Sequence, residues 1–215
     1  SRRRRAANRG RALDLRRIAR RAVARGGEPV DLARRRRPDR PMRLVCLLDV
    51  SGSMEIHARV FLAFVRGLLG ADDQARAWLL HTRLVDATPA LRDRDRLRAA
   101  DRLSLMAQGF GGGTRLGACL AAFVEAHAAK AVNRRTVVVI LSDGCDGDPP
   151  ERLAAALARL RRRAGRIVWL NPLKGWRDYE PTQAAMAAAL PHLDAFLPAN
   201  TLESLAALEG EFARL

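Results

Sequence analysis

Two apolar runs that each close on an aspartate most strongly constrain the fold of this chain. Residues 44–50 contain Asp49 near their end, and Asp143 directly follows residues 136–142. Runs of this length and composition predict strands buried inside a sheet. Both carboxylates are then expected at the carboxyl ends of their strands, the edge along which parallel α/β sheets bind ligands.

Strand and helix patterns alternate after residue 40, which is typical of a mainly parallel sheet with helices on both faces. We predict strands at 44–50, 76–82, 136–142, 166–171 and 193–197, and helices around 60–69, 95–108, 116–124, 148–165 and 200–212. Residues 84–91 are expected to return antiparallel to 76–82 as an edge hairpin. The predicted fold class is therefore α/β, doubly wound, with a mainly parallel sheet and one antiparallel edge strand.

Two predicted helix starts have a purely structural interpretation. Asp148 is followed by Pro149, and Glu151 lies three residues after it, so we expect its carboxylate to cap the helix that follows. Thr114 directly precedes another predicted helix, and capping that helix is an alternative to any role in binding.

Positive charge is concentrated in the first 40 residues. They contain 16 Arg against four acids, a net charge of +12, so the remaining 175 residues carry only +4 of the total of +16. A helix predicted from Leu13 to Val23 has apolar residues on one face and Arg on the other. Pro38 and Pro41 mark a linker. We therefore expect residues 1–40 to form a basic arm and residues 41–215 to form the α/β domain.

Cysteine usage and hydropathy bear on the cellular compartment. The three cysteines, Cys46, Cys119 and Cys145, lack the spacing of a disulfide framework, which favours reduced thiols in a cytoplasmic protein. No apolar run reaches the roughly 18 residues that a membrane span needs. Association with the inner face of the membrane remains an alternative. Because the chain opens on Ser1 rather than Met, we expect it to be a fragment of a longer protein.

Oxygen donors follow three separated turns. Asp49, Ser51 and Ser53 follow the first strand, Thr114 follows the glycines at 111–113, and Asp143 follows a later strand. Two carboxylates and three hydroxyls would make an all-oxygen site suited to a hard divalent cation, magnesium or alternatively manganese. Hydroxyls are weak donors, so the metal would stay electrophilic. It could then accept a further oxygen, such as a carboxylate from a partner protein.

These five residues resemble, without a missing member, the metal-ion-dependent adhesion site of von Willebrand factor A (VWA) domains. The resemblance covers about residues 42–215 and implies that Asp49, Ser51, Ser53, Thr114 and Asp143 hold a metal that mediates protein binding.

A narrower resemblance points to the CoxE-like branch of bacterial VWA proteins. It rests on Asp14-Leu15-Arg16-Arg17, the step at 26–29, the Arg run at 34–37, and the segments 112–117, 142–144, 147–149 and 169–173; Cys145 and Asp146 depart from the family pattern. The resemblance implies a non-enzymatic partner of a MoxR-type AAA+ ATPase in the maturation of a metalloenzyme, such as a molybdenum-containing carbon monoxide dehydrogenase. The client would be recognised through an Asp or Glu ligand.

Two other functions remain open. A magnesium-dependent phosphoester hydrolase could use the two carboxylates to position water, but no second carboxylate cluster, general base or phosphate-binding Lys motif accompanies them. Nucleic-acid binding through the basic arm is a further alternative, although residues 1–40 contain no aromatic residue for stacking.

The remaining reactive or aromatic side chains have ordinary structural interpretations. His57, His81, His127 and His192 show no paired spacing, and Cys145 fits an incidental reduced thiol. Trp169 is expected to be buried beside a strand end, and Trp176 is expected to be a surface contact.

Overall fold

The computed structural model describes residues 5–7, 12–13, 34–36, 43–107, 114–175 and 183–200, and the chain divides into two units, Ser1–Pro41 and Met42–Leu215. In the first unit, β1 (Arg5–Ala7), β2 (Ala12–Leu13) and β3 (Arg34–Arg36) form an antiparallel sheet in the order β1-β3-β2. The helix predicted from Leu13 to Val23 lies outside the described residues, except for Leu13, which ends β2.

The second unit contains a six-stranded sheet in the order β6-β5-β4-β7-β8-β9. Its strands are β4 (Arg43–Asp49), β5 (Arg76–Leu80), β6 (Leu84–Asp86), β7 (Thr136–Leu141), β8 (Arg166–Asn171) and β9 (Ala195–Pro198). All neighbouring pairs are parallel except β5 and β6. The predicted doubly wound, mainly parallel sheet with one antiparallel edge strand is confirmed.

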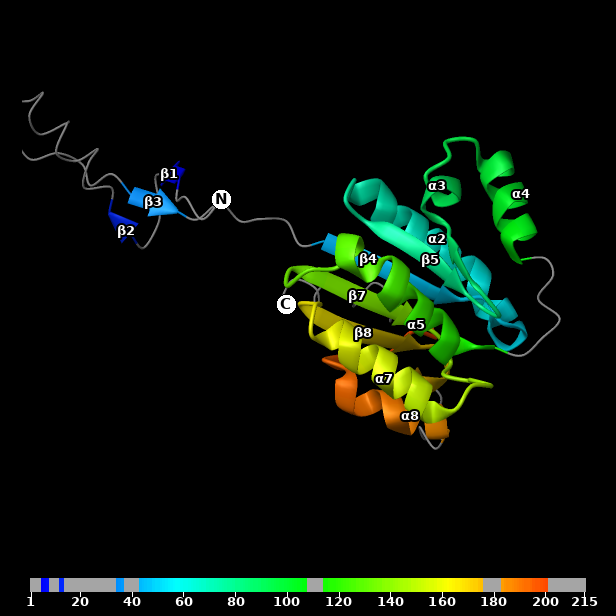
Figure 1. Ribbon diagram of the computed structural model, residues 1–215. Helices are drawn as coiled ribbons and strands as arrows, with labels where there is room; N and C mark the ends of the chain where they lie inside the picture. Colours follow the sequence, from blue (N-terminus) through cyan, green and yellow to red (C-terminus); the bar gives the residue numbers. More distant parts are fainter. Residues whose placement is uncertain are drawn as a thin grey trace, which may run out of the picture. The chain divides into compact units, whose positions relative to one another are not determined.

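Helices cover both faces of this sheet (Figure 1). One face carries α2 (Glu55–Ala71), α3 (Thr88–Leu91) and α4 (Arg96–Ala107); the other carries α5 (Leu116–Ala126), α6 (Ala128–Ala131), α7 (Pro150–Arg161) and α8 (Ala184–Ala189). Short 3-10 turns lie at Gly52–Met54, Leu173–Gly175 and Leu190–His192. The helix predicted after Asn200 lies outside the described residues. Among the helices that are described, none has both the length and the apolar content needed to cross a membrane.

The alternation of side chains along each buried strand builds two cores. In β4, Val45 and Leu47 face the layer of α5 and α7, whereas Cys46 and Leu48 face the layer of α2. The central strand β7 is buried at all six positions, because helices cover it on both sides. Continuous burial explains why these strands appear in the sequence as apolar runs rather than as alternating patterns.

The predicted edge hairpin at 84–91 is shorter than expected. Only Leu84–Asp86 pairs with β5, and Thr88–Leu91 forms the helix α3. The Thr88 hydroxyl accepts a 3.0 Å hydrogen bond from the Ala77 N–H and donates one of 3.2 Å to the Ala77 carbonyl. The Thr88 hydroxyl thus takes the place of a backbone group of β6 as the partner of Ala77. Pro89 has no N–H to donate, so the hydrogen bonds between β5 and β6 could not continue through it.

Candidate metal site

The two acids of the predicted site meet at the carboxyl edge of the sheet. Strands β4 and β7 are parallel neighbours with Leu48 opposite Leu141, so Asp49 and Ser142 are the next residues along this edge. Asp143 follows directly. Asp49 is 1% exposed and Asp143 is 3% exposed. The sheet order therefore places two buried carboxylates beside each other, as the sequence predicted for adjacent strands.

Hydrogen bonds hold both oxygens of the Asp49 carboxylate. The Ser142 hydroxyl donates to Oδ2 at 2.6 Å, and the Ser51 N–H donates to Oδ1 at 3.0 Å. Burial and, to a smaller extent, the charge of Asp143 raise the pKa of Asp49 to about 6, against the Ser142 and Ser51 hydrogen bonds, which lower it. The carboxylate is fixed in position, but its negative charge is poorly stabilised by the protein alone.

The two serines of the Asp49-x-Ser51-x-Ser53 segment follow the end of β4 in a tight turn. The Ser51 and Ser53 hydroxyl oxygens are 3.2 Å apart, and the Met54 N–H donates to the Ser51 carbonyl at 3.0 Å. Ser51 is buried, whereas Ser53 is exposed. The 3-10 turn thus gathers both hydroxyls next to Asp49 and places one of them at the surface, where a partner could reach it.

Thr114 is joined to the loop that follows Asp143. Its carbonyl accepts a 2.8 Å hydrogen bond from the Gly147 N–H, and the next residue, Arg115, donates its N–H to the His81 carbonyl at 2.9 Å, just beyond β5. Thr114 is 8% exposed. The glycines at 111–113 that precede it lie outside the described residues. Backbone hydrogen bonds therefore tie Thr114 to the edge where Asp49 and Asp143 lie.

Thr114 does not cap α5, and Asp148 does not cap α7, which corrects the prediction for Asp148. Helix α5 takes its cap from the loop after β7: Asp146 accepts from the Leu116 and Gly117 N–H groups at 2.9 and 2.8 Å, and Asp148 accepts from the Ala118 N–H at 2.7 Å. Neither Arg115 at the start of α5 nor Pro149 at the start of α7 makes a side-chain cap. Asp148 also pairs with Arg115 at 3.2 Å and with Arg152 of α7 at 3.6 Å, so it joins the starts of both helices.

Side chains of β8 hold the backbone around Asp143. Trp169 Nε1 donates to the Ser142 carbonyl at 2.9 Å, and Asn171 Nδ2 donates to the Asp143 carbonyl at 2.9 Å. The Asp143 carboxylate accepts the Cys145 N–H at 2.9 Å. Gly144 has a φ of +85°, a conformation that side chains with a Cβ rarely adopt. The β8 side chains and the Asp143 carboxylate thus hold the loop by hydrogen bonds, and the positive φ of Gly144 restricts its backbone conformation.

Among the other residues singled out in the sequence, Trp169 is fully buried beside a strand end, as predicted. His127 packs against Trp78, with ring centroids 5.5 Å apart. Cys145 is a free, half-buried thiol whose pKa is raised by burial and by the charge of Asp143. Trp176 lies outside the described residues.

Sequence reasoning missed that Ser142 holds Asp49 and that Asp146 caps α5. Ser142 is fully buried, and its hydroxyl links Asp49 to the Gly144 N–H, which donates to it at 3.0 Å. The position of Ser142, at the end of an apolar run and directly before Asp143, was the signal that could have revealed its role. Asp146 gave no local signal, because its partners are 29 and 30 residues earlier in the chain.

The donors fit a hard divalent cation. Within the described part of the chain, no Lys or Arg forms an ion pair with Asp49 or Asp143, so two buried carboxylates lack a counter-charge. The same part of the chain has no group of three or more His, Cys, Asp or Glu side chains placed to hold a metal. A cation here would depend on two acids plus hydroxyls, a donor set that suits magnesium better than zinc. The five ligands stay a prediction.

Comparison with known proteins identifies the family and the fold. The profile of the family described as VWA domain containing CoxE-like protein matches residues 1–205. No curated protein sequence matches the chain.

Solved structures share the fold at low sequence identity. An aerotolerance-related membrane protein from Bacteroides fragilis is 14% identical, with a TM-score of 0.52 over 81% of this chain and 100% of that one. A von Willebrand factor type A protein from Catenulispora acidiphila is 20% identical, with a TM-score of 0.51 over 80% of this chain and 41% of that one. Proximal thread matrix protein 1 from the mussel byssus, with a zinc-occupied MIDAS motif, is 16% identical, with a TM-score of 0.50 over 80% and 47%. This chain spans less than half of the last two.

Proposed function

Because the chain belongs to the family of VWA domain containing CoxE-like proteins, we propose that it is a non-enzymatic, metal-dependent protein-binding adaptor. The observation that carries the proposal is the pair of buried acids, Asp49 and Asp143, at one sheet edge without a counter-cation among the described residues. Burying like charges together is costly unless a cation neutralises them.

Five residues would hold the ion: Asp49, Ser51, Ser53, Thr114 and Asp143. When bound, magnesium would offer a coordination position to a carboxylate oxygen of a partner. The chain's own residues orient the ligands. Ser142 and the Ser51 N–H hold Asp49, while Trp169 and Asn171 hold the backbone next to Asp143.

The loops around the site are coupled through α5. Asp146 and Asp148, which follow Asp143, cap the first turn of the helix that Thr114 precedes. A displacement of the Asp143 loop would therefore be transmitted to Thr114 and to α5. A binding switch needs two such states with different affinities for the partner. The partner that we propose is a MoxR-type AAA+ ATPase, with a metalloenzyme such as a molybdenum-containing carbon monoxide dehydrogenase as the client.

Calorimetric titration of the full chain with Mg²⁺ and with Mn²⁺ tests the metal site. We expect one ion to bind and Asp143→Ala to abolish binding. Asp101→Ala, which removes an exposed acid from α4, is the matched control and should bind normally. If Asp143→Ala binds Mg²⁺ as tightly as the unmodified chain does, the proposed metal site is wrong.

Pull-down of the ATPase tests the adaptor role separately. Capture should require Mg²⁺, fail in EDTA and fail with Asp143→Ala. Capture that persists without metal would leave the ion site intact but refute its role in binding. A phosphoester turnover assay separates the adaptor from the hydrolase alternative. We expect no turnover, and sustained activity that is lost in Asp49→Ala would overturn the adaptor proposal.

A further inference from the structure

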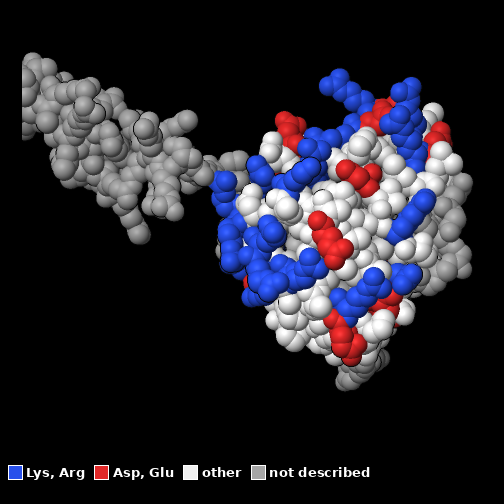
Figure 2. Space-filling view, in the orientation of Figure 1, with Lys and Arg blue, Asp and Glu red and all other residues white. Residues whose placement is uncertain are grey.

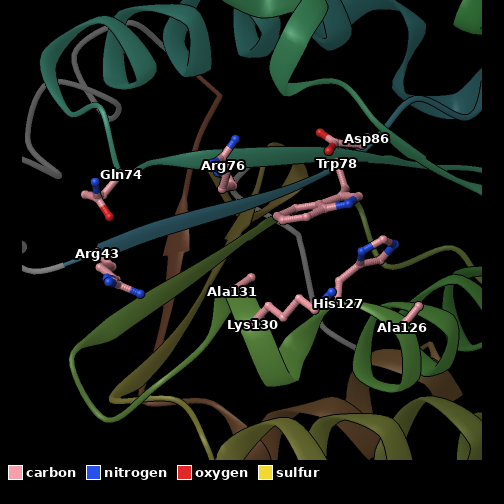
Figure 3. A pocket seen from close by; sticks show the side chains of 9 residues that line it. All are labelled: Arg43, Gln74, Arg76, Trp78, Asp86, Ala126, His127, Lys130 and Ala131. Carbon is pink, nitrogen blue, oxygen red and sulfur yellow. The ribbon is translucent and has the colours of Figure 1, made fainter.

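A pocket of about 500 Å³ lies at the opposite edge of the sheet, where the parallel strands begin. Arg43 is the first residue of β4, Arg76 is the first residue of β5, and the strand register brings Arg76 opposite Val45. Lys130 reaches the pocket from α6 (Figure 3). A volume of this size is within the range of small-molecule sites. The pocket shares no lining residue with the metal site.

Positive charge dominates the lining. Arg43, Arg76 and Lys130 face a single acid, Asp86. No described residue forms an ion pair with any of these three cations. Other basic residues do find partners, as Arg159 does with Glu125 and Arg161 does with Asp194, both at 3.2 Å. Figure 2 shows Lys and Arg side chains gathered on the side of the domain where β4, β7 and β8 begin.

Trp78 forms one wall of the pocket, and its indole N–H has no acceptor among the described residues. Trp78 is 4% exposed, and its Nε1 has no hydrogen-bond partner among the described residues. Phe123 packs edge-on against the ring at 4.9 Å between centroids, and His127 lies at 5.5 Å. Figure 3 shows the indole lying across the pocket, with its nitrogen on the side of His127. The nitrogen is itself buried, so the indole N–H serves as a reporter beside the pocket and not as a donor to the ligand.

We propose that this pocket binds a small organic oxyanion carrying two or more negative charges, a phosphate ester or a polycarboxylate. Guanidinium groups donate paired hydrogen bonds to phosphate and carboxylate oxygens, and the ammonium group of Lys130 adds a point charge. With Asp86 included, the lining carries a net charge of +2, which matches a dianion. Because Arg43, Arg76 and Lys130 come from three separate elements, the ligand would be held from several sides.

The experiment follows the indole N–H resonance of Trp78 in the ¹⁵N-labelled full chain, assigned by its loss in Trp78→Phe. Pyrophosphate and citrate are titrated separately in metal-free buffer at constant ionic strength. We expect a saturable shift with at least one of them. The double variant Arg76→Ala/Lys130→Ala should weaken that binding at least tenfold.

The matched control is Arg134→Ala/Arg162→Ala, which removes two exposed cations outside the pocket and keeps the basic arm. Its affinity should stay within twofold of the unmodified chain. If the pocket double variant does not fold, Lys130→Ala alone, at an exposed helix position, should weaken binding at least threefold.

The outcomes are decisive. Absence of a saturable Trp78 shift with both ligands, or equal weakening in the pocket and control variants, would overturn the site, because general charge would then explain any binding. Tighter binding of pyrophosphate assigns the ligand to the phosphate-bearing compounds, and tighter binding of citrate assigns it to the polycarboxylates.

Discussion

The Ser142 hydroxyl donates a 2.6 Å hydrogen bond to Oδ2 of Asp49, joining two buried residues that are 93 positions apart in the chain. The bond runs from Ser142, the residue after β7, to Asp49 at the end of β4. It fixes the Asp49 carboxylate, although Ser142 is not itself one of the five predicted ligands. Ser142 is thus a positioning residue for the proposed metal site.

Replacing Ser142 with Ala tests this positioning role. Residues that orient metal ligands typically change metal affinity by about 10- to 100-fold when they are lost, so we expect Mg²⁺ to bind about tenfold more weakly to Ser142→Ala. Calorimetry measures the change. Ser104→Ala, an exposed serine on α4, should bind normally. Unchanged affinity in Ser142→Ala would show that Asp49 is held well enough by Ser51.

The stability of the metal-free protein should depend on pH through Asp49. Its pKa is about 6 in the folded state against an ordinary value of 3.8, so the folded state binds this proton more tightly than the unfolded state does. The stabilisation from the protonated acid is full below pH 3.8 and is lost as the pH rises through about 6. By pH 7.5 the loss is about 3 kcal/mol.

Urea unfolding in EDTA from pH 4 to 8 measures this effect, with Asp49→Asn as the variant that cannot titrate. The stability of Asp49→Asn relative to the unmodified chain should rise by about 2.5 kcal/mol over that range, because at pH 4 the unfolded chain has already lost much of this proton. A difference that does not change with pH would contradict the raised pKa.

Removing the cap that Asp146 supplies to α5 should lower both the stability of the protein and its affinity for Mg²⁺. Asp146→Ala deletes the acceptor of two α5 amides, so we expect a loss of about 1–2 kcal/mol of stability and weaker Mg²⁺ binding, since α5 follows Thr114.

Asp95 provides the comparison, because it accepts the N–H groups of Leu97 and Arg98 at the start of α4. Asp95→Ala should lower stability without changing Mg²⁺ affinity. Equal effects of the two variants on metal binding would argue against coupling through α5.

Gly144 should tolerate no other residue. Its φ of +85° disfavours a Cβ, and a Cβ placed there would overlap the side chain of Met186. We expect Gly144→Ala to lower the free energy of unfolding by about 2 kcal/mol or more. In Gly144→Ala/Met186→Ala, the overlap is gone but the strained φ remains. A double-mutant cycle in urea should therefore show that Met186→Ala is less harmful beside Gly144→Ala than alone, and additive losses would rule out the overlap.

Part of the fold followed from local pattern. Residues 166–171, predicted as a strand, form β8, and the predicted helix after Thr114 begins at Leu116. The predicted capping box at Asp148 was wrong because the pattern shows that an acid can cap the next helix, not which amides lie nearest in space. The hairpin at 84–91 was overextended for a similar reason, since the Thr88 hydroxyl bonds with Ala77, 11 residues away.

The sequence by itself determined the buried strands, the order of the elements and the candidate donors, because apolar runs and the Asp-x-Ser-x-Ser spacing act within a few neighbouring residues. Only the tertiary structure decided that Ser142 holds Asp49, that Asp146 and Asp148 cap α5, and that Arg43, Arg76 and Lys130 line one pocket with Trp78. These relationships depend on which strands are neighbours and in what register. Side chains tens of residues apart meet only after the chain has packed into one sheet.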